Sequence, residues 1–147
     1  MSYITNADIE ERLGTDTYVQ LTDDDGDGVA DVGVVDEARL GAVGEVDSYL
    51  AHRYQVPIDV ATFSELAGLL ASVALDLVEH RLRARRPPVP DATVRKWEAT
   101  ITWLTRVAGG EVELPSVGAL PPNAARGIVA EISGSDRVLS REEMSDH

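Results

Sequence analysis

The sequence predicts a mainly α-helical protein: a small helical bundle of about four helices with an acidic loop and an extended C-terminal arm. Apolar residues recur three and four positions apart in several segments, and capping and stop signals bound those segments. This periodicity disappears after residue 110. A chain of 147 residues, 44% of them apolar, has room for one modest core. We therefore expect one helical domain over residues 1–110 and an extended or disordered arm over residues 111–147.

The first helix is predicted over residues 6–13. Thr5 and Asp8 resemble a capping box, Ile9 and Leu13 repeat at helical spacing, and Gly14 ends the turn. Residues 16–21 fit either another helical turn or an extended piece. Residues 22–33 are rich in aspartate and glycine, a composition typical of a loop.

The second long helix is predicted over residues 35–54, before Pro57. Its apolar residues repeat with helical spacing at Val35, Ala38, Ala42, Val46, Tyr49 and Leu50. Gly41 and Gly44 each weaken a helix by about 1 kcal/mol relative to alanine. They mark either the close approach of another backbone or two tolerated weak positions.

The next helix is predicted over residues 62–85, where Thr62 and Glu65 form a capping box. Its main apolar face comprises Leu66, Leu70, Val73, Leu77 and Val78. Leu69 and Leu75 fall outside that face, so we expect this helix to be buried on two sides, either centrally or against another subunit.

A last helix is predicted from Asp91, as its N-cap, to the glycines at 109 and 110. Its core stripe comprises Val94, Trp97, Ile101, Leu104 and Ala108. Trp103 lies beside this stripe as a second edge of the core or as an interface anchor. In the arm, residues 128–132 fit a short strand and residues 141–144 a helical turn.

Composition excludes several functional classes. A net charge of −13 argues against a broad basic surface for DNA, and the absence of cysteine removes disulfides, thiolate metal sites and cysteine nucleophiles. The N-terminus lacks the features of a signal peptide, and the most apolar segment, residues 66–75, is too short to span a membrane. We expect a soluble protein that is made inside the cell and has no membrane partner.

Charge is unevenly distributed along the chain. Residues 1–37 hold eleven acidic residues against one arginine, whereas residues 81–97 hold six basic residues against one aspartate. Opposite poles of this kind suit ordered contact with copies of the chain or with a charged neighbour. Two separately solvated faces are the alternative interpretation.

The acidic loop resembles a calcium-binding EF-hand loop that begins at Asp23. Carboxylates occupy positions 1, 3, 5 and 9 and a glycine occupies position 6, but Val34 stands where a bidentate glutamate is required. Asp36 or Glu37 would have to replace that ligand. The candidate Ca²⁺ ligands are Asp23, Asp25, Asp27, Val29, Asp31 and Glu37. An Asp/Gly turn whose side chains accept hydrogen bonds from local amides is the alternative.

No catalytic motif accompanies this loop. None of the three histidines has a recognisable motif beside it, and no nucleophile elbow, metalloprotease or phosphate-loop signature occurs. We expect no enzymatic activity and no cofactor other than a possible Ca²⁺ ion.

Several segments, in order, resemble the small Mu-like bacteriophage and prophage protein family. They are SYITNADIEERLG, the loop QLTDDDGDGVAD, EVDSYLAHRYQVPI, the aliphatic helix that runs into arginines, and SDRVLSREEM. The resemblance implies a structural protein of the virion: a head–tail connector or adaptor subunit that forms a ring, commonly of about twelve copies, beneath the portal. A calcium-regulated binding module and a tail-completion protein are the alternatives.

The resemblance also implies partners and a location. The partners are further copies of the chain, the portal protein and a neck or tail-completion protein, while DNA passes through without specific binding. The protein is expected at the head–tail junction after synthesis in the host cytoplasm. Candidate interface residues are Leu69, Leu75, Arg81, Arg83, Arg85, Arg86, Trp103, Arg137, Val138 and Leu139.

Overall fold

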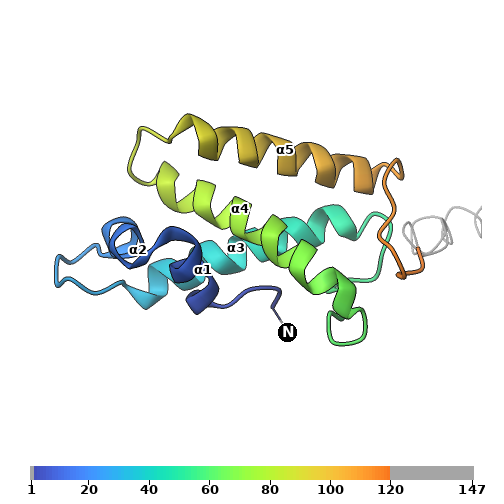
Figure 1. The fold of residues 1–147 in the computed structure, drawn as a ribbon, viewed down its shortest axis with the longest axis horizontal. Coiled ribbons are helices and arrows are strands. Elements are labelled where there is room, and N and C mark those ends of the chain that lie inside the picture. Colours follow the sequence, from blue (N-terminus) through green and yellow to red (C-terminus); the bar gives the residue numbers. More distant parts are fainter. Residues whose placement is uncertain (1, 120–147) are drawn as a thin grey trace, which may run out of the picture.

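The computed structural model describes residues 2–119, which form a bundle of five α-helices (Figure 1). The elements are α1 (Asn6–Leu13), α2 (Thr15–Thr22), α3 (Val32–Leu50), the 3-10 turn η1 (Ser64–Leu66), α4 (Ala67–Ala84) and α5 (Asp91–Ala108). Residues 2–119 contain no strand, so the mainly helical fold class is confirmed. The expected strand at 128–132 and helical turn at 141–144 lie outside the described residues.

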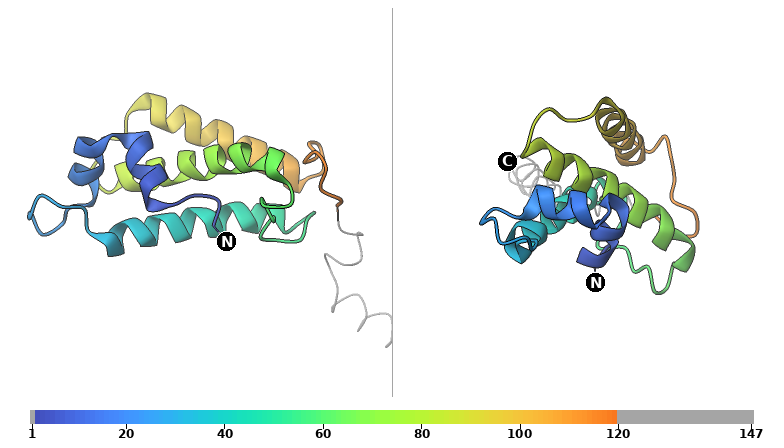
Figure 2. Two further views of the ribbon diagram at one scale, coloured as in Figure 1. Left: turned by 60° about the horizontal axis from the view of Figure 1, so that its bottom comes forward. Right: turned by 60° about the vertical axis from the view of Figure 1, so that its left-hand side comes forward.

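Helix α4 is the centre of the bundle. It packs against α3, α5 and α1, and toward the acidic loop it lies between α3 and α5 (Figures 1 and 2). The face predicted from the sequence is buried, and further apolar residues of this helix, such as Ala74 and Leu82, are buried as well. Central burial within one subunit therefore accounts for most of the wide apolar surface, although Leu69 is 39% exposed and Leu75 is half-buried.

The N-terminal helices follow local signals closely. Thr5 Oγ1 accepts a hydrogen bond from the Asp8 amide at 3.2 Å, and the Asp8 carboxylate accepts one from the Thr5 amide at 2.8 Å. The predicted capping box is thus confirmed. The undecided segment forms α2, which buries Tyr18 and Leu21. Gly14, with a positive φ of 83°, makes the turn between α1 and α2.

The predicted starts of two helices were wrong. Helix α3 begins at Val32 and ends at Leu50 instead of spanning 35–54, and α4 begins at Ala67 instead of 62. Asp59 explains the second difference, because its carboxylate accepts hydrogen bonds from the Ala61 amide and the Thr62 hydroxyl. Since Thr62 is engaged in this local turn, it does not form the expected capping box with Glu65.

Helix α5 is rotated relative to its predicted orientation. It buries Thr93, Thr100, Leu104 and Val107; of the predicted stripe only Leu104 is buried, and the other members are half-buried. The two threonine hydroxyls donate hydrogen bonds to carboxylates of α4, which stabilises polar side chains in the helix contact. Asp91 is also not an N-cap, because it is the first helical residue and follows Pro90.

The chain returns to the bundle after α5. Leu114 is buried, and its amide donates a hydrogen bond to the Tyr54 hydroxyl at 2.9 Å. Val112 and Val117 also pack against the core. The later part of the expected arm, with Arg137, Val138 and Leu139, lies outside the described residues. None of the described helices combines the length and apolarity needed for a membrane span.

Candidate functional site

The acidic loop projects from one end of the bundle, between α2 and α3 (Figure 1). Asp23, Asp25, Asp27 and Asp31 each offer one carboxylate oxygen, and these oxygens all lie within 4.8 Å of one another. Hard oxygens gathered in this way are the donors that Ca²⁺ binds in proteins. The structure therefore brings together four of the six Ca²⁺ ligands that the sequence spacing predicted.

Local hydrogen bonds shape this loop. The Asp23 carboxylate accepts hydrogen bonds from the amides of Gly26 and Gly28, both at 2.8 Å, and Asp27 accepts one from the Val29 amide at 3.0 Å. The φ angles of 77° at Gly26 and 80° at Gly28 allow the chain to turn back on itself. The loop thus has the features of an Asp/Gly turn as well as a cluster of oxygen donors.

Crowding of carboxylates shifts their protonation. A hydrogen bond with the Asp31 carboxylate, which only protonated Asp25 can donate, raises the pKa of Asp25 to about 6. The Gly28 amide, in contrast, lowers the pKa of Asp23. A divalent cation bound among these oxygens would offset their mutual repulsion.

Neither Asp36 nor Glu37 joins the four carboxylates in place of the glutamate that an EF-hand loop requires. Glu37 is exposed on α3 and does not belong to the group of four carboxylates. Asp36 is engaged elsewhere, because it accepts hydrogen bonds from Asn6 at 2.9 Å and Arg39 at 3.2 Å. The expected substitution of Glu37 for the missing ligand therefore stays a prediction: α3 starts early, at Val32, and Glu37 is exposed on it.

Arg85 and Arg86, at the end of α4, bind the acidic loop of their own chain. Arg85 donates hydrogen bonds to the Asp24 carboxylate at 2.6 Å and to the Leu21 carbonyl at 2.5 Å. Arg86 donates to the Asp24 carboxylate at 3.1 Å and to the Asp23 carbonyl at 3.2 Å. The two charge poles seen in the sequence thus neutralise each other in part within one subunit.

The other candidate interface arginines are also paired internally. Arg81 forms an ion pair with Glu45 at 2.9 Å, and Arg83 lies 3.8 Å from Glu79, which is buried. At Gly41 a Cβ would lie 2.8 Å from Nη1 of Arg81, so the close neighbour is the end of a flexible side chain and not the backbone of another helix. Gly44 has no such neighbour.

The apolar interface candidates differ in exposure. Leu75 and Trp103 are half-buried against the core of their own subunit, whereas Leu69 remains 39% exposed. His80 stacks on Trp97 with the ring centroids 4.4 Å apart, so this histidine is engaged in packing between α4 and α5.

A network centred on Asp76 escaped prediction. Its carboxylate accepts hydrogen bonds from Arg12 and from the Thr100 hydroxyl, each at 2.8 Å, and thereby joins α1, α4 and α5. No sequence pattern links these three residues, because they are far apart along the chain.

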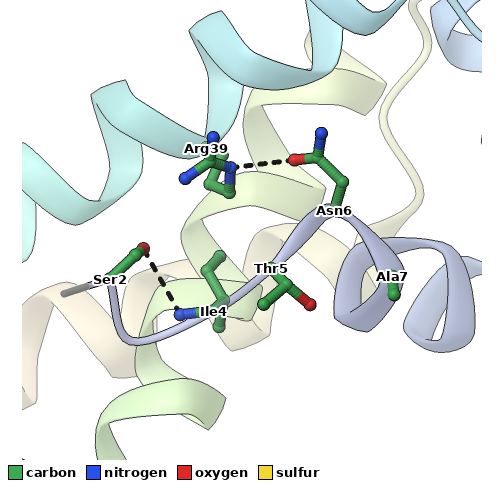
Figure 3. A pocket seen from close by; sticks show the side chains of 6 residues that line it. All are labelled: Ser2, Ile4, Thr5, Asn6, Ala7 and Arg39. Carbon is green, nitrogen blue, oxygen red and sulfur yellow. Dashed lines mark hydrogen bonds between the residues drawn. The ribbon is translucent and has the colours of Figure 1, made fainter.

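An open pocket of about 530 Å³ lies between the N-terminal segment and α3 (Figure 3). Its lining residues are Ser2, Ile4, Thr5, Asn6, Ala7 and Arg39. The Arg39 Nε atom donates to the Asn6 side-chain oxygen at 2.8 Å, and the same guanidinium contacts Asp36. The Arg39 guanidinium of this pocket is engaged with its own neighbours and Ile4 is only 1% exposed, so little of the lining is available to a binding partner.

Comparison with known proteins gives one family. A comparison with curated proteins finds no match. The family model described as Bacteriophage Mu, Gp36 matches residues 3–131, which include all five helices and the acidic loop. Since the match covers nearly the whole chain, it includes the described bundle as well as part of the sequence beyond it. The chain therefore belongs to the bacteriophage Mu Gp36 family of phage proteins.

Proposed function

We propose that this chain is a virion structural protein, a head–tail connector subunit that forms a ring below the portal and joins head to tail. Membership of a bacteriophage protein family is the observation that carries the proposal. Three parts of the proposal go further than family membership and rest on the sequence resemblance. They are the connector role, the ring and the location at the head–tail junction. The proposed partners are further copies of the chain, the portal protein and a neck or tail-completion protein.

The character of the bundle supports a role through binding rather than catalysis. The buried Glu79 and the half-buried Asp76 accept hydrogen bonds from threonines of α5, and Asp76 also pairs with Arg12 of α1. Such contacts hold the helices in fixed relative positions, as a subunit of a ring requires. We propose no catalytic role for the chain.

The net charge supports a position around a DNA channel. At −13, most of the molecule repels nucleic acid, so DNA can pass the subunit without adhering to it. A ring closes when each copy presents two different complementary surfaces to its two neighbours.

Sedimentation of the full chain tests the ring. We expect rings in concentrated protein at low salt, or after addition of the portal protein of the same phage. A monomer in both conditions would refute ring formation. Labelling of the subunit in intact particles tests the location, because a connector lies at the portal vertex and a tail-completion protein at the tail.

We propose a calcium-binding loop as a second candidate function, favoured by the four carboxylate oxygens within 4.8 Å of one another. Calorimetric titration with Ca²⁺ and thermal melting in Ca²⁺ or chelator test this candidate. We expect a measurable heat of Ca²⁺ binding and a higher melting temperature in Ca²⁺ than in chelator. Absence of both leaves only the Asp/Gly turn.

A further inference from the structure

We propose that two opposite faces of the bundle bind each other between neighbouring copies. The first, the apolar-acidic face, comprises Val29, Val32, Glu37 and Leu40, at the end of the acidic loop and along α3. The second, the basic face of α5, comprises Arg95, Lys96, Ala99, Trp103 and Arg106. The inference deepens the proposed ring and depends on it, because it requires copies of the chain to associate.

The apolar-acidic face gathers apolar side chains that the bundle does not cover. Val29, Val32 and Leu40 are 62%, 64% and 61% exposed, and they are the most exposed large apolar side chains among the described residues. Val32 and Leu40 are separated by two turns of α3, and the exposed Glu37 adds negative charge on this helix. Exposed apolar residues beside a charged residue are typical of a protein interface.

The basic face is what remains of the positive charge once the internal ion pairs are formed. The arginines of α4 bind acidic residues of their own chain. Among the described residues, Arg95 and Lys96 are the two basic side chains outside any ion pair. Both are exposed, so their charge is available to another molecule.

Helical spacing adds an aromatic residue to this charge. Lys96, Ala99, Trp103 and Arg106 follow one another at spacings of three, four and three along α5, which places them on one side of the helix. Trp103 is half-buried, while Ala99 is small and exposed. Arg106 contacts Glu111 only at 3.9 Å, and the two side chains are 60% and 74% exposed. A tryptophan between two cations suits a partner surface that is apolar and acidic.

The positions of the two faces fit a head-to-tail contact. Near the acidic loop, α3 and α5 lie on opposite sides of α4, as Figure 1 and the left view of Figure 2 show. Each copy can therefore offer its basic face to one neighbour and its apolar-acidic face to the other. Contacts of this heterologous kind continue from copy to copy and close into a ring when the rotation allows. A second copy is the partner because both complementary faces belong to the same chain.

Cysteine cross-linking of the full chain tests the pairing, since the natural sequence contains no cysteine. Leu40→Cys and Ala99→Cys proteins are mixed under the low-salt, concentrated conditions, or with the portal protein, and then oxidised. We expect a disulfide-linked dimer from the mixture, and a ladder of higher oligomers from the double variant. The matched control combines Leu40→Cys with Ser72→Cys, because Ser72 is exposed on α4 outside both faces. The control mixture should give little product.

Charge reversal gives an independent measurement. Lys96→Glu or Glu37→Lys alone should weaken association about tenfold, and a mixture of the two variants should recover most of the loss. Self-association without cross-linking above the control would overturn the assigned faces and leave the ring standing. Cross-linking of Ala99→Cys to the portal alone would also overturn them. A chain that stays monomeric under every condition would overturn both the pairing and the ring.

Discussion

Replacement of Asp76 by alanine should destabilise the bundle by about 2–3 kcal/mol, because it removes the group that joins three helices. The carboxylate accepts hydrogen bonds from Arg12 in α1 and Thr100 in α5, each at 2.8 Å. A hydrogen bond to a charged group contributes about 1.5–3 kcal/mol. The side chains of Arg12 and Asp76 are 24% and 17% exposed, so water partly replaces the lost contact and the lower end of that range applies to each bond.

Urea unfolding followed by tryptophan fluorescence measures this loss, since both tryptophans lie on α5 and report its separation from α4. The midpoint should fall while the slope stays unchanged. Thr100→Val should cost about 1 kcal/mol, because one of the two hydrogen bonds remains. Glu98→Ala, at an exposed position of α5, serves as the control and should change stability by less than about 0.5 kcal/mol. An Asp76→Ala protein as stable as this control would refute the role given to the network.

Three further predictions, made with four substitutions, test other parts of the structure. Tyr54→Phe should cost about 1–2 kcal/mol in urea unfolding, because the buried Leu114 amide loses its acceptor; an unchanged midpoint would contradict this role of the Tyr54 hydroxyl. Gly44→Ala should stabilise the protein by up to about 1 kcal/mol. Gly41→Ala should stabilise it less, since a Cβ at residue 41 would contact the Arg81 side chain. A larger gain from Gly41→Ala than from Gly44→Ala would contradict this packing. Asp25→Asn should raise the melting temperature at pH 7 in chelator. This gain should disappear below about pH 4, where the wild-type carboxyl is protonated in both the folded and the unfolded chain. With bound Ca²⁺, Asp25→Asn should instead lower the melting temperature.

The sign of the last prediction follows from the raised pKa. Between its ordinary value of 3.8 and about 6, Asp25 binds its proton more tightly in the folded state than in the unfolded chain. Its contribution to stability is therefore present at low pH and is lost as the pH rises through about 6. A benefit of Asp25→Asn that is equal at pH 4 and pH 7 would show that the effect is not electrostatic.

Features that depend on near neighbours in the chain could be predicted from the amino-acid sequence. Helical spacing predicted the buried face of α4, and the Thr5–Asp8 pair predicted the start of α1. The alternation of aspartates predicted the cluster of Asp23, Asp25, Asp27 and Asp31, because a short glycine-containing loop folds alternate side chains around one centre. The order of the same motifs also predicted the phage family.

Contacts between residues that face one another across the bundle depend on how all the helices pack, and these contacts were not predicted. Periodicity identified an apolar stripe on α5 but not its rotation, because hydrogen bonds from buried threonines to Asp76 and Glu79 set that rotation. Charge counting identified two poles but not their mutual contact, since Arg85 and Asp24 meet only when α4 ends beside the acidic loop. Local patterns fix dihedral angles and the polarity of a helix face, whereas pairing across the bundle depends on the packing of all the helices together.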